Sequence, residues 1–272
     1  MRSFKRCSLV SFCFASMLAI AACTTSRSLI NPSDLAQGSP ENIASLTAVI
    51  QKNPNDALGY NVRGTAFGRA GRYKEALADF STAIQLNPQF YSAYANRALI
   101  YKNLGRNVEA LNDYNQALQI KPDYSVALIG RGNLYRASGQ IDLAFNDFNQ
   151  AIQSGTTDGR AWYGRGLIEQ LRGQYGESIV DFGAAMSRQP KAVPPYNARG
   201  LSYVALGDWE NAFDDFNAAL RLSENVAESW ANQALVYEHR GNKPRAYLSY
   251  SKALQLDPNY KPAKDGMKRT RD

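Results

Sequence analysis

Apolar, aromatic and small residues return along most of this chain with a period of 34 residues. In units of that length, position 15 is always glycine, position 24 is aromatic, and positions 8, 20 and 27 are small. A repeat of this length predicts one supersecondary unit per period, stacked on its neighbours. Position 32 is proline at Pro54, Pro88, Pro122, Pro190 and Pro258, with Thr156 and Glu224 at the two remaining points.

Each unit is expected to be a pair of antiparallel helices. The glycine at position 15 adopts the left-handed backbone that closes a first helix, and the proline at position 32 ends a second one. Small residues let the helix backbones approach, while large residues at positions 4 and 24 fill the space beside them. No pair buries its apolar face alone, so each unit depends on its neighbours.

This pattern resembles the tetratricopeptide repeat (TPR) family over residues 57–260. The resemblance implies an all-α fold, a right-handed superhelical solenoid of six TPR helix pairs plus an N-terminal half-repeat helix. The solenoid is expected over residues 41–260, as the half-repeat 41–56 and the repeats 57–90, 91–124, 125–158, 159–192, 193–226 and 227–260.

The two ends of the repeat array differ. Ser39 and Pro40 supply an N-cap and a first-turn proline for the half-repeat helix. Residues 261–272 hold five basic and two acidic side chains and are interpreted as a basic C-terminal tail, too short and too polar for a full capping helix. The packing surface of the last repeat is then partly uncovered, and either a second copy of the chain or another partner could bind at that end.

Two charged series share the period of the repeat. Arginine recurs at position 7 and aspartate at position 23, each in five units. We interpret the series as an Arg–Asp ladder within or between units, of pairs that contribute little each, and an anion-binding stripe of arginines is the alternative.

The fourth unit departs from the pattern. Glu169 stands at position 11, where the other units carry an aromatic residue. A carboxylate at a packing position is costly unless it is paired, and Arg165 and Arg172 are the expected partners on the same helix. Two interpretations of Glu169 remain open. It is either a local structural compromise or part of a hinge or altered groove that contacts a basic partner.

The N-terminus has the features of an exported lipoprotein. Residues 1–22 join a basic start to an apolar stretch too short to span a bilayer, which is typical of a signal peptide. Ile20-Ala21-Ala22-Cys23 resembles the bacterial lipobox, and the resemblance implies that Cys23 is lipidated and begins the mature protein. An ordinary soluble export signal is the alternative. Two or more acyl chains anchor a protein stably, and residues 23–40 then form a flexible tether.

Composition and charge exclude several functions. The chain has one histidine, His239, and no cysteine beyond Cys23, so a His-ligated metal site and a disulfide scaffold are ruled out. No Gly-rich phosphate loop or acid/base pair stands out, so we expect no cofactor and no enzymatic activity. Most of the net charge of +7 comes from residues 1–22 and 261–272, so we predict no nucleic-acid partner.

By the TPR resemblance, ligands bind the concave face, which first-helix positions 2, 5, 6, 9, 12 and 13 line. Amide, cationic and aromatic side chains there suit the backbone of an extended peptide. The two-carboxylate clamp of chaperone-binding relatives is not reproduced, because position 5 is not lysine in the first three units. Ordinary solvation is the alternative for any single candidate. The predicted contacts are Asn61, Arg69, Asn96, Lys102, Asn133, Arg136, Arg160, Tyr163 and Asn197.

These features together predict a lipid-anchored scaffold that binds protein or peptide partners in the periplasm. The chain resembles outer-membrane TPR lipoproteins that act as adaptors between cell-wall hydrolases and periplasmic proteases. Thr24, rather than an aspartate, follows the cysteine, and in this it resembles lipoproteins that are sent to the outer membrane. A pilus-assembly or secretion-system lipoprotein and a cell-wall glycan-binding module are the alternatives.

Overall fold

The computed structural model describes residues 37–271, so the predicted signal peptide, Cys23 and most of the predicted tether lie outside the described residues. The described part is all-helical, and none of its helices combines the length and apolar character needed to cross a membrane. The helices are α2 (Pro40–Lys52), α3 (Ala57–Arg69), α4 (Tyr73–Leu86), α5 (Tyr91–Asn103), α6 (Asn107–Ile120), α7 (Ser125–Ala137), α8 (Ile141–Gln153), α9 (Arg160–Leu171), α10 (Tyr175–Arg188), α11 (Val193–Ala205), α12 (Trp209–Leu222), α13 (Ala227–His239), α14 (Lys243–Leu256) and α15 (Lys261–Arg269).

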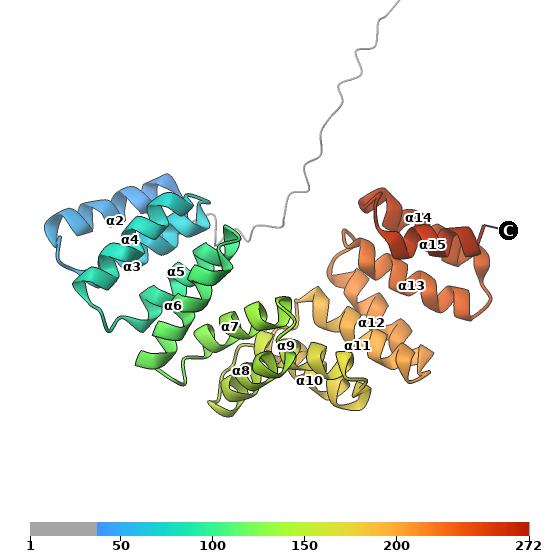
Figure 1. Cartoon of the computed structure of the whole chain (residues 1–272). Helices are drawn as coiled ribbons and strands as arrows, with labels where there is room; N and C mark the ends of the chain where they lie inside the picture. Colours follow the sequence, from blue (N-terminus) through green and yellow to red (C-terminus); the bar gives the residue numbers. More distant parts are fainter. Residues whose placement is uncertain (1–36, 272) are drawn as a thin grey trace, which may run out of the picture.

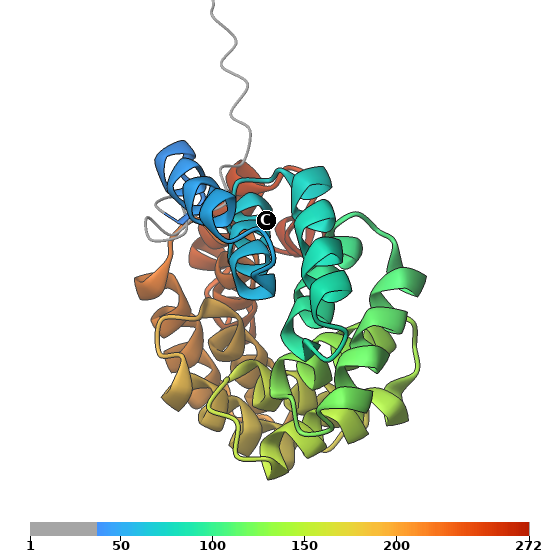
Figure 2. The ribbon, with the colours of Figure 1, turned by 90° about the vertical axis from the view of Figure 1, so that its left-hand side faces the viewer.

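The helices form one superhelical stack, which confirms the predicted fold class. The two helices of each unit pack together, and each second helix also packs against the first helix of the next unit. The stack bends into an arch, with α7 and α9 on the inner side of the curve and α8 and α10 on the outer side (Figure 1). Figure 2 shows that the winding of the arch carries the last helices behind the first ones.

The turn inside each unit has the conformation that its glycine predicts. Gly105, for example, has φ +73°, a backbone that an L side chain rarely adopts. The N–H of Arg106 then donates to the carbonyl of Tyr101 at 2.9 Å, which closes α5. The position-15 glycines of all units have a positive φ in the same range.

Contacts between small and aromatic residues build the core. Phe148 of α8 is fully buried and lies against Gly132 of α7, where an added Cβ would sit 3.1 Å from the ring. Gly64 and Phe80 make the same contact in the first unit, at 2.8 Å from the ring. The small residue is therefore needed because the aromatic ring occupies the volume of a side chain.

The junction between α8 and α9 has Thr156 in place of the position-32 proline. Gly155 has φ +77°, and the N–H of Thr156 donates to the carbonyl of Ala151 at 3.3 Å. Asp158 then accepts from the backbone N–H of Arg160 at 3.0 Å at the start of α9. A left-handed glycine thus ends α8 and an aspartate begins α9, at the junction where the units with a proline at position 32 use that proline.

The C-terminal segment differs from the sequence-based expectation. Residues Lys261–Arg269 form a helix, α15, which packs on α14 and α13 as the first helix of a seventh unit would. Ala263 and Gly266 of α15 are buried against α14, and Arg269 donates to Glu238 of α13 at 2.6 Å. The expectation was wrong because small residues on one face of the segment allow close packing while the charged residues stay on the other face.

Candidate ligand-binding surface

The concave surface consists of one face of each first helix: α3, α5, α7, α9, α11 and α13. Successive first helices touch one another along this side of the stack, whereas the main contacts of the described helices include no pair of second helices from neighbouring units. Positions 2, 5, 6, 9, 12 and 13 share one helical face inside the arch. Position 5 is buried in most units, as Ala95 and Ile129 show, whereas positions 2, 9, 12 and 13 reach solvent.

Apolar side chains lie exposed on the concave surface of the first three units. Leu58 is 57% exposed, Val62 41%, Leu99 45% and Val126 40%. They stand at positions 2, 6, 9 and 2 of their units, so they follow one another along the inside of the stack. We call these four residues the apolar stripe. The sequence-based prediction considered amide, cationic and aromatic candidates and missed this stripe, although its aliphatic residues stand at the same concave positions.

A row of cations accompanies the apolar stripe. Arg69, Lys102 and Arg136 occupy positions 12 or 13 of the first three units, at the C-terminal ends of α3, α5 and α7. These three helices contain no acidic residue. The second helices α4, α6, α8, α10 and α12, in contrast, carry two or three acids each. In the first three units the charges are thus separated, with cations on the concave first helices and acids on the second helices.

Two of the predicted groove residues contact each other. The Nδ2 of Asn96 donates to the Oδ1 of Asn61 at 3.0 Å, across the boundary between the first two units. Asn96 is half-buried and Asn61 is buried. Asn133 is half-buried and donates to the carbonyl of Ile129 on its own helix. Asn96 and Asn133 therefore reach the surface of the groove, and Asn61 supports Asn96 from below.

The middle of the groove brings side chains of opposite charge near one tyrosine. Burial raises the pKa of Tyr163, and the negative charge of Glu228 raises it further while the positive charge of Arg136 lowers it. These residues come from units three, four and six, so the curvature of the stack brings them within electrostatic range. Glu228 itself is exposed, and partial desolvation raises its pKa. Glu228 was not among the predicted groove residues.

The remaining predicted groove residues have different environments. Asn197 is 1% exposed, and its Nδ2 donates to Ser229 Oγ at 2.8 Å, so it lies between α11 and α13 rather than on the surface. Arg160 is exposed and pairs with Asp158. Arg69 is exposed and Lys102 is half-buried. Ligand binding by any of these residues stays a prediction.

The repeated arginines at position 7 belong to a ladder rather than to the groove. Arg131 donates to both carboxylate oxygens of Asp147, at 2.9 and 2.7 Å, and its Nη1 donates to Asn115 of the preceding unit at 2.9 Å. The ladder therefore links helices both within and between units. The Asp147 side chain is only 5% exposed, so these pairs are not the weak surface pairs that the sequence suggested. The same Arg–Asp pairing joins Arg63 to Asp79, Arg97 to Asp113, Arg165 to Asp181 and Arg199 to Asp215.

Glu169 lies beneath the surface, beside the ladder. It is 8% exposed, and its Oε2 is buried without a hydrogen-bond partner. Burial, with the nearby Asp181 carboxylate, raises the pKa of Glu169 to about 7. Arg165 lies 3.9 Å from Glu169 but is held by Asp181, and Arg172 pairs with Asp142 instead of Glu169. The expected neutralisation is therefore partial, and the buried position favours the structural compromise over contact with a partner.

The one histidine of the chain packs against an aromatic ring. His239 is exposed and stacks on Trp209 of the preceding unit, with ring centroids 3.8 Å apart. Within residues 37–271, no cluster of three or more His, Cys, Asp or Glu side chains forms a metal site.

Comparisons with known proteins agree with this geometry. A family model described as Tetratricopeptide repeat matches residues 61–125, 129–193 and 197–261. A search of curated proteins gives no match.

Several solved structures share the fold. The APC/C hetero-tetramer Cut9-Hcn1 gives a TM-score of 0.77 at 21% identity, over 88% of this chain and 47% of that chain, so this chain spans about half of it. A tetratricopeptide repeat protein from Parabacteroides merdae gives 0.60 at 29% identity, over 85% of this chain and 91% of that one. PilW, described as a type IV pilus biogenesis factor, gives 0.68 at 21% identity, over 77% of this chain and 97% of its own.

Proposed function

The chain belongs to the tetratricopeptide repeat family, and from this premise we propose that it is a non-enzymatic scaffold that holds protein partners at a bacterial cell envelope. The observation that carries the proposal is the concave surface, where an exposed apolar stripe runs beside Arg69, Lys102 and Arg136. Apolar side chains of a bound segment fit the stripe, and acidic ones fit the cations. The favoured ligand is therefore an extended protein segment that carries both kinds of residue.

The cell-envelope part of the proposal rests on the N-terminal sequence. A signal peptide over residues 1–22 and a lipobox-like ending at Cys23 predict a lipid anchor in the outer membrane, with the repeats facing the periplasm. Residues 23–40 then act as a tether. In this position the solenoid would hold a soluble partner close to the cell wall, as an adaptor between cell-wall hydrolases and the proteases that control them.

Pilus assembly is the second candidate. The observation in its favour is the likeness to PilW, which covers 97% of that chain. At 21% identity this likeness shows the fold alone. The identity of the captured partner distinguishes the two candidates, since a hydrolase or protease supports the first and a pilus component the second.

The anchor is tested by metabolic labelling with palmitate. The wild-type chain is expected to incorporate the label and to fractionate with membranes, and Cys23→Ala is expected to lose both properties. Label that persists in Cys23→Ala contradicts lipidation at this residue. Cys13→Ala, inside the predicted signal peptide, serves as the matched control and should label normally.

The groove is tested by affinity capture from the periplasm with three versions of the solenoid. The triple variant Asn96→Ala/Asn133→Ala/Arg136→Ala removes half-buried side chains of the concave face, and it is expected to lose partners that the wild type captures. The control variant removes three exposed side chains of second helices: Lys74→Ala, Asn146→Ala and Lys252→Ala. If the concave variant captures the same proteins as the control, the concave face is not the binding surface.

A further inference from the structure

Helix α2, at the N-terminal end of the stack, differs from the other second helices in what covers it (Figure 1). In complete units, positions 20, 23, 24 and 27 of the second helix face the first helix of the same unit. On α4 these residues are at most 6% exposed: Ala76, Asp79, Phe80 and Ala83. Within the described residues α2 has no first helix of its own, and it packs on α3 of the next unit.

The equivalent residues of α2 form an uncovered surface. They are Asn42, Ser45, Leu46 and Val49, which we call the open face of α2. Val49 at position 27 is 52% exposed, whereas the alanine at that position is fully buried in every complete unit. Ser45 is exposed, and Asn42 and Leu46 are half-buried. The exposure of the open face is therefore a property of this end of the stack and not of the repeat.

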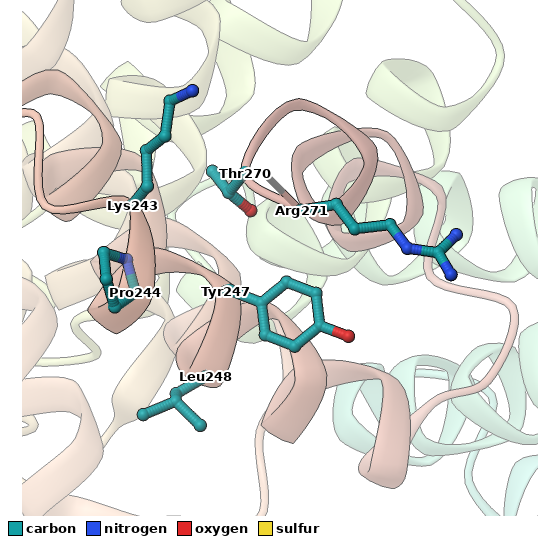
Figure 3. Close-up of a pocket in the computed structure, with 6 residues that line it drawn as sticks. All are labelled: Lys243, Pro244, Tyr247, Leu248, Thr270 and Arg271. Carbon is teal, nitrogen blue, oxygen red and sulfur yellow. The ribbon is translucent and has the colours of Figure 1, made fainter.

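The hollow at the C-terminal end of the stack is of a different kind. Figure 3 shows this hollow of about 560 Å³, with Tyr247 and Leu248 on α14 and Arg271 just beyond α15. Leu248 is 67% exposed, but Val180 at the same position of the fourth unit is 71% exposed although further units follow it. Tyr247 is half-buried, as Phe213 at the same position is. These exposures belong to the repeat itself, whereas the open face of α2 departs from it.

The side chains of the open face do not match a first helix of the usual kind. Positions 20 and 27 are alanine or serine in every complete unit, which lets the first helix approach the second one closely. Asn42 and Val49 occupy these positions in α2, and both side chains are larger. Because close packing is sensitive to such volumes, the open face favours an occupant other than a regular first helix.

Two charged residues stand at the ends of the open face. Glu41 lies in the first turn of α2 and Lys52 in the last turn, and α2 has no other charged residue. Eleven positions, or about three helical turns, separate them, so both lie along the same edge of the open face. Both residues are exposed. The charge pattern is thus opposite at the two ends, with no net charge.

We propose that the open face of α2 binds the open face of a second copy of this chain, with the two α2 helices antiparallel about a two-fold axis. Each Glu41 then meets Lys52 of the other copy, because both charges lie on the same edge. The open face and the two charges are both centred on Leu46, so one axis joins the apolar centres and pairs the charges. A parallel arrangement would instead bring like charges together.

A helix of a different protein is the less favoured occupant. The open face has no net charge with which to attract a charged segment, whereas its two ends complement each other in a second copy. One helix face is small beside the roughly 800 Å² per partner of a stable interface, so the dimer is expected to be weak and to depend on protein concentration. This inference does not rest on the concave binding surface, since no residue of the open face belongs to a first helix.

Disulfide formation in the full chain under a mild oxidant tests the contact. Ser45→Cys places an exposed thiol beside the axis, and a disulfide-linked dimer is expected, because a disulfide needs Cα atoms within about 7 Å. Gln51→Cys is the matched control. Gln51 is exposed on the same helix, two residues beyond Val49 and so on a different side, and it should give no linked dimer. The wild-type chain, whose cysteines all lie at or before Cys23, gives the background.

Charge and apolar variants in the Ser45→Cys background test the arrangement. Val49→Glu puts a carboxylate into the contact and should raise the protein concentration for half-maximal linkage at least about tenfold, or about 1.4 kcal/mol. Lys52→Glu places two acids at each end and should also reduce linkage. Adding Glu41→Lys to Lys52→Glu restores opposite charges in an antiparallel pair, so linkage should return.

Every other result overturns the proposal. Absent linkage, or equal linkage from Ser45→Cys and Gln51→Cys, means that the open faces do not meet. Linkage that Glu41→Lys fails to restore excludes the antiparallel pair. If the thiol of Ser45→Cys neither links nor reacts with a maleimide, another part of the same chain covers the open face. Linkage to a different protein assigns the open face to that protein instead.

Discussion

The arginine–aspartate pairs are the clearest case in which single residues stabilise the stack. Each aspartate is nearly excluded from water and receives two hydrogen bonds from one guanidinium, as Asp147 does from Arg131. In the sixth unit both partners change together. Gln233 replaces the arginine and Ser249 the aspartate, and Ser249 Oγ donates to Gln233 at 3.0 Å. Replacing both partners avoids leaving a buried charge alone.

Removal of one ladder partner is therefore predicted to be costly. Arg131→Ala leaves the Asp147 carboxylate buried without its cation, and the free energy of unfolding should fall by about 3–5 kcal/mol. Glu109→Ala removes the acid of an exposed pair with Arg106 and should cost less than about 1 kcal/mol. Urea denaturation of both variants measures the difference. Similar small losses in the two would show that the buried pairs contribute no more than surface pairs.

Glu169, unlike the arginine–aspartate pairs, destabilises the folded state when it is ionised, so its effect on the free energy of unfolding depends on pH. Burial raises its pKa from 4.5 to about 7, so between these values the folded state keeps a proton that the unfolded state has lost. The free energy of unfolding falls as pH rises through this range. Glu169→Gln removes the ionisation, so the variant should be more stable than the wild type by about 1–3 kcal/mol at pH 8, with a smaller difference near pH 4.5.

Urea denaturation across pH 4.5 to pH 8 measures this difference. Glu224→Gln, an exposed position between α12 and α13 whose charge does not act on Glu169, is the control and should follow the wild-type pH profile. If the Glu169→Gln and wild-type profiles run parallel, Glu169 is ionised in the folded protein throughout this range.

Among the helices, α15 shows how a short polar segment can cap a stack. Gly266 lies so close to the ring of Tyr250 that an added Cβ would sit 2.1 Å from Cζ. Arg269 bonds to Glu238 across the same contact, and Glu238 accepts from the hydroxyl of Tyr250 at 2.8 Å. A close glycine contact and a polar network thus hold a helix with few apolar side chains of its own.

Glycine-to-alanine substitutions test this packing. Gly266→Ala forces α15 away from Tyr250 and should lower the free energy of unfolding by about 1–3 kcal/mol. Gly176→Ala, in the first turn of α10, has nothing within 4 Å of the added Cβ and should be neutral or stabilising by up to about 1 kcal/mol. Thermal melts of the two variants give the comparison. An unchanged melting temperature for Gly266→Ala would mean that α15 does not pack as described.

In the molecule as a whole, stability is passed between neighbouring units. The helix contacts run from each unit to the next along the stack, so the described repeats form a nearly one-dimensional chain. In the first three units charge is also arranged along the stack, with acids on the second helices and cations on the concave face. Binding of an acidic segment is accordingly expected to weaken as salt rises.

Truncation after Tyr260 tests the coupling between neighbours. Loss of α15 uncovers Tyr250, Ala253 and the inner face of α14. Hydrogen exchange is expected to accelerate in α13 and α14, with little change in α3 to α6. Equal acceleration along all units would indicate that the stack opens as one cooperative body.

The sequence alone determined the local elements of this protein. Residue types at fixed spacing predict the period, the glycine turns, the small–aromatic contacts and the partners of the Arg–Asp series. Each of these features depends only on neighbours within one unit or the next. The groove was predicted less completely. Its positions followed from the repeat, but Asn197 lies below the surface and the apolar stripe and Glu228 were missed. These outcomes depend on side-chain depth, which spacing does not specify.

Only the tertiary structure decided the features that span distant units or the ends of the stack. The curvature brings Tyr163 of unit four near Glu228 of unit six, and no repeat pattern specifies the angle between successive units. The burial of Glu169 without its expected partner and the docking of α15 likewise depend on packing against particular neighbours. Local chemistry thus specified the helices, and the accumulated geometry of packing decided which of their side chains face a ligand.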